Sequence, residues 1–198
     1  SVAGGGGAGR AALRLVQGLR AAGAEATLLA LSTKDEPETV AWDVQDPQLL
    51  AHLEDAATIQ RSYVDLWRDA QRSNTRFSPA STGLDLSAHP LVTTAELIHL
   101  HWLNDFVDVP QIAALARRKP TVWTLHDQWP FTGGCHYSDG CTAFSASCAP
   151  CPLLIKDPLD STHRLLQEKL THGLGQGITV VSPSRWLADM AGRSRVFA

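Results

Sequence analysis

Four short apolar runs alternate with helix-like segments along the chain, and this alternation constrains the fold more than any other feature. The apolar runs are residues 25–31, 97–102, 121–125 and 178–181. Helical spacing of apolar side chains, or a helix start signal, marks residues 9–23, 46–74, 108–118, 161–172 and 182–191. Strands that alternate with helices are typical of an α/β fold with an open, mostly parallel sheet. We therefore expect that sheet, with helices flanking it.

Local signals predict where the helices begin. Asp108, followed by Pro110, predicts the start of one helix, because an Asp side chain accepts a hydrogen bond from the first turn. Asp160 or Ser161 is expected to cap the next helix. A glycine run, residues 4–7, precedes the first helix, and a strand normally leads into such a run. No strand pattern precedes these glycines, so we expect the first strand of the sheet to be missing here.

Composition excludes several classes of protein. Hydrophobic residues make up 44% and charged residues 19% of the sequence, which is typical of a globular chain. The net charge of −3 gives no basic surface for nucleic acid. The sequence has no apolar run long enough to span a membrane, and its N-terminal residues lack the apolar core of a signal peptide. We expect a cytoplasmic location, possible peripheral membrane association aside.

The topology of a parallel sheet also predicts where a ligand would bind. Ligands of open α/β sheets lie beyond the carboxyl ends of the strands. In this sequence that rule selects the glycine run, His101, His126 and the Ser182–Ser184 segment. Polar side chains cluster at these same places, so the sequence indicates one cleft at this edge.

Several motifs, taken together, resemble glycosyltransferase family 4. They are GGGGAGRAALRL, LIHLHWLNDF, TVWTLHDQWPFTGGCHY with the cysteine loop that follows it, and VVSPSRWLADMA. Within this family, the motifs resemble the branch that builds bacterial exopolysaccharides such as colanic acid. It implies the N-terminal half of a GT-B fold, in which two Rossmann-like domains face each other across a cleft. Residues 1–198 would then form the acceptor-side domain, with the donor-binding domain absent from this chain.

The resemblance also implies an activity. Members of the family transfer a sugar from a nucleotide-sugar to a glycan or lipid-linked acceptor, with retention at the anomeric carbon and usually without a catalytic metal or cofactor. We expect this sugar transfer to take place in the cytoplasm, including at the inner face of the membrane. The transfer is described as a front-side displacement in which an oxygen of the leaving diphosphate takes the acceptor's proton. This fragment alone is expected to lack full activity.

The resemblance assigns candidate site residues. His126 would hydrogen-bond the donor sugar, and Asp127 would either orient its imidazole or cap the turn. His101 is expected in the cleft, whereas His99 is expected to face the other side of the strand in a structural role. Candidate contacts to a diphosphate or to acceptor hydroxyls come from the helix start and from loops: Gly5, Gly6, Gly7, Arg10, Asn104 and Ser184. For each of them a purely structural or solvated role is the alternative.

All four cysteines fall within one loop, residues 133–152. Cys135, Cys141, Cys148 and Cys151 have the spacing C-x5-C-x6-C-x2-C. Four thiolates so close in sequence suit a structural zinc ion, although only the last pair has the short spacing typical of zinc knuckles. Reduced thiols, two disulfides, or a redox pair at Cys148 and Cys151 are the alternatives, the last requiring a depressed thiol pKa.

Two other functional classes stay open at this stage. The chain would be a non-catalytic binding module if it bound a ligand without turnover. It would be a thiol redox protein if the Cys148–Cys151 pair were reactive.

Overall fold

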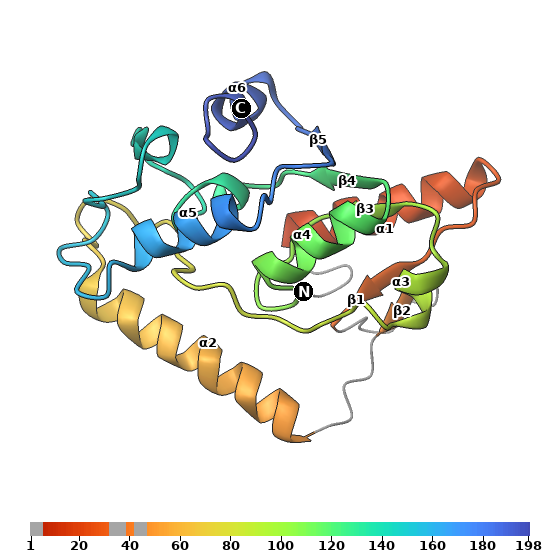
Figure 1. Cartoon of the computed structure of the whole chain (residues 1–198), viewed down its shortest axis with the longest axis horizontal. Coiled ribbons are helices and arrows are strands. Elements are labelled where there is room, and N and C mark those ends of the chain that lie inside the picture. Colours follow the sequence, from red (N-terminus) through yellow and green to blue (C-terminus); the bar gives the residue numbers. More distant parts are fainter. Residues whose placement is uncertain (1–5, 32–38, 42–46) are drawn as a thin grey trace.

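Two small parallel sheets carry the strands of this chain, where the sequence led us to expect one. The computed structural model describes residues 6–31, 39–41 and 47–198, and it confirms the predicted α/β class (Figure 1). One sheet pairs β1 with β2, and the other has the order β3-β4-β5 with both pairs parallel. The strands are β1 Leu28–Ala30, β2 Thr39–Ala41, β3 Ile98–Leu100, β4 Thr121–Thr124 and β5 Ile178–Val181.

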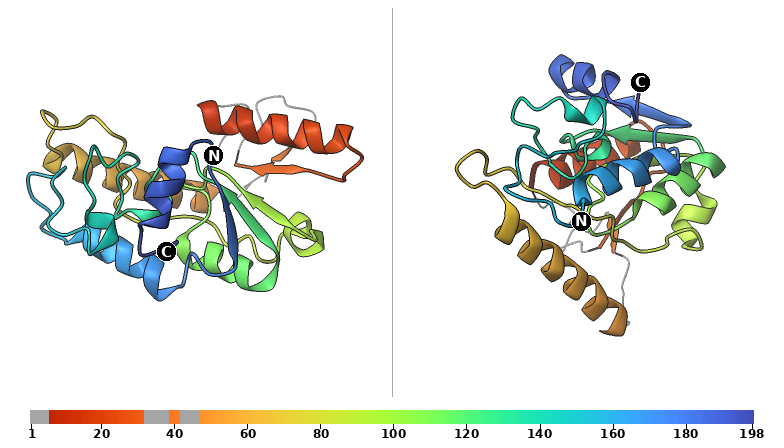
Figure 2. Two further views of the ribbon diagram at one scale, coloured as in Figure 1. Left: turned by 90° about the horizontal axis from the view of Figure 1, so that it is seen from above. Right: turned by 60° about the vertical axis from the view of Figure 1, so that its left-hand side comes forward.

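Helices flank the three-stranded sheet. Figures 1 and 2 show α4 and α5 on one side of it and α1 on the other, while α2 runs outward from the body of the protein. No helix in the described ranges is both long enough and apolar enough to cross a bilayer. The helices are α1 Gly6–Ala21, α2 Pro47–Trp67, α3 Pro90–Thr94, α4 Val109–Arg118, α5 Ser161–Thr171 and α6 Arg185–Gly192.

The core forms between α4, the β3-β4-β5 sheet and the chain that follows β4. Val109 and Ile112 on α4 are completely buried, as is Leu125 just after β4. Trp123 on β4 is 1% exposed. Burying apolar side chains of this size is the main favourable term in folding, about 1.5–3 kcal/mol for each one. This cluster therefore fixes the carboxyl ends of β3 and β4 in place.

The structure tests the predicted helix caps. The carboxylate of Asp108 accepts a hydrogen bond of 2.9 Å from the Gln111 N–H, so the cap of α4 is confirmed. Asp160 lies at the N-cap position of α5, as predicted, but its side chain makes no cap hydrogen bond. Asp157 caps α5 in its place and accepts hydrogen bonds from the N–H groups of Ser161 and Thr162. Burial raises the pKa of Asp157, but hydrogen bonds from the Tyr63 hydroxyl and from Thr162 and Ser161 outweigh it and lower the pKa to about 2.

Two elements were not predicted, and both are short. β2 has three residues and α3 has five, and neither is long enough to show a periodic pattern. α3 begins at Pro90, in a part of the sequence for which no helix or strand was predicted. The long polar stretch after β1 therefore contains more regular structure than its composition indicates.

The cysteine-containing loop packs closely against the start of α5. A Cβ atom added at Gly133 would lie 2.3 Å from the carbonyl oxygen of Thr162 and 2.8 Å from the Cβ of Cys148. The Thr162 hydroxyl also donates a hydrogen bond of 2.7 Å to the Cys148 carbonyl. The absence of a side chain at Gly133 thus permits this contact.

Gly133→Ala is predicted to lower the free energy of unfolding by about 1–3 kcal/mol, because the added methyl group overpacks this contact. The matched control is Gly18→Ala in α1, where nothing lies within 4 Å of the new Cβ. That change should raise stability by about 0.5–1 kcal/mol through helix propensity. Urea unfolding of both variants gives the comparison, and equal stabilities would contradict the predicted contact.

Candidate active site

Three histidines stack beside one another at the carboxyl ends of β3 and β4. The ring centroids of His99 and His101 are 4.7 Å apart, and those of His101 and His126 are 5.2 Å apart. The Nδ1 atom of His101 and the Nε2 atom of His126 are 2.9 Å apart, within hydrogen-bond distance. The two histidines that the sequence places after neighbouring strands therefore form one hydrogen-bonded pair.

The expectation for the orientation of His99 was wrong. Residues two positions apart in a strand share a face, so His99 lies on the same side as His101. Its Nε2 atom is 2.8 Å from the Thr124 hydroxyl on β4. His99 therefore adds a third imidazole to the row and anchors it to the neighbouring strand.

Burial keeps these imidazoles neutral at neutral pH. Desolvation is the largest effect at each ring, and it lowers the pKa of His99, His101 and His126. The pKa of His101 falls to about 4, because its two histidine neighbours add to the effect of burial. At His126 the nearby Asp127 opposes the shift. The row is therefore a set of neutral donors and acceptors.

The His101 backbone is also fixed by the core. The indole Nε1–H of Trp123, which is almost fully buried, donates a hydrogen bond of 3.0 Å to the His101 carbonyl. His101 cannot shift along the sheet edge without breaking this bond. The position of the histidine row is thus preorganised by packing.

A cavity of about 520 Å³ opens beside the histidine row. This volume is in the range that holds a small-molecule ligand. His99 and His101 line it. His126 is not among its lining residues and is linked to the cavity wall by its hydrogen bond to His101. The helix start, the β1 edge and the loop after β3 supply other lining residues. These include Gly6, Gly7, residues 28–31, Asn104 and Asp105.

The remaining predicted site residues divide between this cavity and other places. Gly6 and Gly7 line the cavity as the first residues of α1, while Gly5 lies outside the described residues. Arg10 is exposed on α1. Ser184 caps α6 by accepting a hydrogen bond of 3.2 Å from the Leu187 N–H, which explains this serine without a ligand.

Asp127 does not hydrogen-bond His126, and of its two predicted roles the structure shows the second, which is to cap the turn. One carboxylate oxygen accepts a hydrogen bond of 2.9 Å from the Trp129 N–H, and the other lies 2.7 Å from Nδ1 of His136. The Nε2 atom of His136 is in turn 3.1 Å from the Ser78 hydroxyl. All three residues are at most 5% exposed. The serine, histidine and carboxylate are therefore a buried structural network, inaccessible to a substrate.

Sequence reasoning missed His136 and Ser78. His136 belongs to the GGCHY segment that we assigned to the cysteine loop, and Ser78 lies 58 positions earlier in the chain. The network reaches the cavity through stacked groups. The Trp102 ring lies 4.9 Å from that of His136, and the Arg76 guanidinium lies 5.4 Å from the centre of the Trp102 ring. Arg76 pairs with Asp105 at 3.3 Å on the cavity wall.

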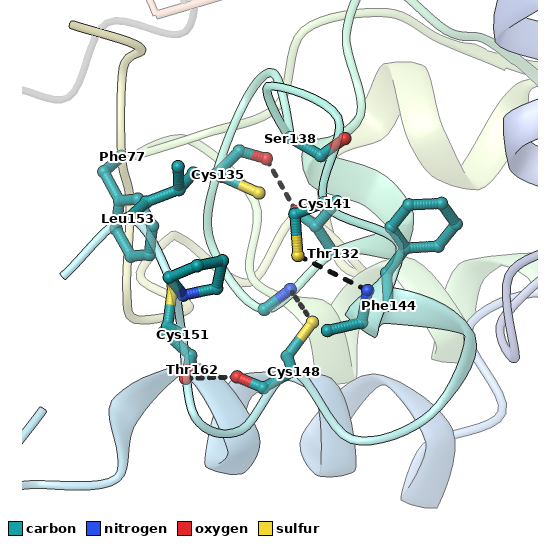
Figure 3. Close-up of a pocket in the computed structure, with 13 residues that line it drawn as sticks. Phe77, Thr132, Cys135, Ser138, Cys141, Phe144, Cys148, Cys151, Leu153 and Thr162 are labelled. Carbon is teal, nitrogen blue, oxygen red and sulfur yellow. Dashed lines mark hydrogen bonds between the residues drawn. The ribbon is translucent and has the colours of Figure 1, made fainter. Parts of the chain in front are cut away.

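The four cysteines line a second, much smaller cavity, drawn in Figure 3. Burial raises the pKa of Cys135 to about 12 and that of Cys148 to about 11, and it also raises the pKa of Cys151. A redox nucleophile needs the opposite shift, so the redox hypothesis for Cys148 and Cys151 is disfavoured. Within residues 6–31, 39–41 and 47–198, no three His, Cys, Asp or Glu side chains are grouped in a ready-made metal centre.

Comparison with known proteins identifies the family. The sequence profile of Glycosyltransferase Family 4 matches residues 5–196. The chain belongs to this family. It is also 35% identical to the putative colanic acid biosynthesis glycosyl transferase WcaC of Escherichia coli (strain K12), over 52% of this chain and 28% of that protein. The resemblance stated from the sequence is thus confirmed, while the match spans under a third of the relative's length. No solved structure matches this chain significantly.

Protonation of the histidine row is predicted to destabilise the fold. His101 has a folded pKa of about 4, below its ordinary value of 6.5, so the unfolded chain binds protons first. The free energy of unfolding should therefore fall as pH drops from about 6.5 towards 4, and should not change from this cause above that window. His101→Gln should flatten the decline, whereas His52→Gln, at an exposed position on α2, should not. An unchanged pH profile in His101→Gln, measured by urea unfolding, would contradict the assignment.

Proposed function

We propose that the intact protein is a retaining glycosyltransferase that moves a sugar from a nucleotide-sugar to a glycan or lipid-linked acceptor. The observation that carries the proposal is the His101–His126 pair beside a ligand-sized cavity at the carboxyl ends of β3 and β4. Family membership and the similarity to a putative colanic acid biosynthesis enzyme support it. They favour exopolysaccharide synthesis, at the cytoplasmic face of the membrane, as the process served.

The hydrogen-bonded pair of neutral imidazoles is suited to a sugar. Each neutral ring carries one N–H, and only one of those protons lies between His101 Nδ1 and His126 Nε2. Whichever ring donates, the two outer nitrogens then present one donor and one acceptor. A sugar hydroxyl is itself both donor and acceptor, so it can bind to either nitrogen. We assign His126 to the donor sugar, and His101 to holding His126 and facing the acceptor side of the cavity.

The transfer itself needs no nucleophile from this chain. The acceptor hydroxyl oxygen forms a bond to the anomeric carbon on the face that the diphosphate leaves, and the bond from that carbon to the phosphate oxygen breaks. The acceptor's proton passes to the departing diphosphate. The histidine row would position the sugar for this step, and its low dielectric surroundings would strengthen each hydrogen bond to the substrate.

We further propose that this domain works with parts outside residues 1–198. The edges of β1 and β3 border the same cavity but belong to separate sheets, so a further strand between them would join the two into one. Such a strand would place backbone beside Gly6 and Gly7 and narrow the cavity to the cleft beside the histidines. A second domain would bind the nucleotide and close over that cleft.

The kinetic test uses the full-length protein with a panel of nucleotide-sugars and measures nucleoside diphosphate release with a glycan or lipid-linked acceptor. His126→Ala is predicted to lower kcat by about 100-fold or more, as loss of a preorganised hydrogen bond to the reacting group does. His101→Ala should lower kcat as well. Because the two side chains act as a pair, the double variant should be less impaired than the product of the single effects.

The control is His52→Ala, at an exposed site on α2 away from the histidine row. It should leave kcat and KM unchanged. Full turnover by His126→Ala would remove this side chain from the site. Tight binding of a nucleotide-sugar without any turnover, by the intact wild-type protein, would favour a binding module in place of an enzyme.

A further inference from the structure

The four thiols of the chain surround a single small cavity, although they come from different turns of a loop without strands or long helices. Cys135, Cys141, Cys148 and Cys151 all line it, together with Phe77, Phe144 and Leu153 (Figure 3). The cavity has a volume of about 20 Å³, which is room for about one water-sized particle. Thr132, Ser138 and Thr162 also line it, and because sulfur is the ligand that soft metal ions prefer, the thiols are its main ligating groups.

Backbone groups already donate hydrogen bonds to two of these sulfurs. The Gly133 N–H lies 3.2 Å from Sγ of Cys148, and the Ala143 N–H lies 3.4 Å from Sγ of Cys141. Such donors stabilise a negatively charged sulfur more than a neutral thiol, because the charge strengthens the hydrogen bond. The loop backbone is therefore arranged to hold thiolates.

A buried positive charge lies close to the same loop. Lys169 on α5 is fully buried, and its ammonium group donates to the carbonyl oxygens of Trp129 and Thr132. In the described part of the chain, no carboxylate is within ion-pair distance of Lys169. Burial lowers the pKa of Lys169 to about 7, and negative charge on Cys148 or Cys135 would favour its protonated form. A buried ammonium without an anion is costly, so the site has a use for negative charge on the sulfurs.

We propose that the four cysteines bind one zinc ion as thiolates, and that the ion fastens the loop to α5 beside the catalytic cleft. Zinc favours four tetrahedral sulfur ligands in structural sites, and Cys148 and Cys151 have the two-residue spacing common in such sites. Binding converts Zn²⁺ and four thiols into a zinc tetrathiolate of charge −2 and releases four protons. Lys169 would offset part of that negative charge.

Binding requires a local change in the side chains, since the described cysteines are not yet grouped as metal ligands. Each cysteine has a single side-chain torsion, and the four already border the same space. Rotation about these torsions would bring the sulfurs towards a common centre with little movement of the backbone. A loop of twenty residues with one short 3-10 turn is also longer than most loops of compact domains, and a cross-link would help to order it.

The test measures metal in the full-length protein, purified without chelator from cells grown with added zinc. Elemental analysis by mass spectrometry should find about one zinc ion per chain. Any zinc held by cysteines outside residues 1–198 would add to this number. Thiols of this loop should resist a thiol reagent until a chelator is added, as followed by peptide mapping of the labelled cysteines. Replacing zinc with Co²⁺ should give the intense visible absorption of tetrahedral cobalt thiolate.

Cys151→Ser should lose the loop zinc, whereas Ser145→Ala, an exposed change in the same loop, should keep it. If Cys151→Ser does not fold, the chelator and cobalt experiments on the wild-type protein still decide the matter. Freely reactive loop thiols with no bound metal would overturn the proposal. So would two disulfides in the peptide map, or iron with acid-labile sulfide in place of zinc.

Discussion

The buried contact between the Asp127 carboxylate and the His136 ring holds the site in place. Through its other oxygen Asp127 accepts a hydrogen bond from the Trp129 N–H, and through His136 it is linked to Ser78, so the chain after β4 is tied to a segment much earlier in the sequence. Stacking of Trp102 on His136 adds the chain that leaves β3. Removing one partner of such a buried charged contact costs about 3–5 kcal/mol, so the arrangement is strongly constrained.

This constraint determines which neighbouring side chain is available for chemistry. The Asp127 side chain is bound to His136 in the interior, whereas the adjacent His126 meets His101 at the sheet edge. The Trp123 indole fixes His101, the other member of the pair, by donating a hydrogen bond to its carbonyl. The candidate catalytic pair thus depends on two buried residues that never contact a substrate.

The sequence predicted four of the five described strands, and the long helices, because their signals are local. Val109 and Ile112 follow a helical period, TVWT is rich in strand formers, and Asp108 is a cap visible in isolation. It could also place His101 and His126 at one edge from topology alone. It could not show that Asp127 pairs with His136, or that Asp157 caps α5, because those partners are set by packing of the whole chain. The separation into two sheets was missed for the same reason.

The most direct test of the account is a crystal structure of the intact protein with a non-hydrolysable nucleotide-sugar bound. If the proposed function is correct, a hydroxyl of the donor sugar lies within about 3 Å of a His126 ring nitrogen, and His101 lies on the far side of that ring. The proposal also predicts the diphosphate next to the N-terminus of α1. A donor sugar bound away from the histidine row, with the His101–His126 pair left facing solvent, would contradict it.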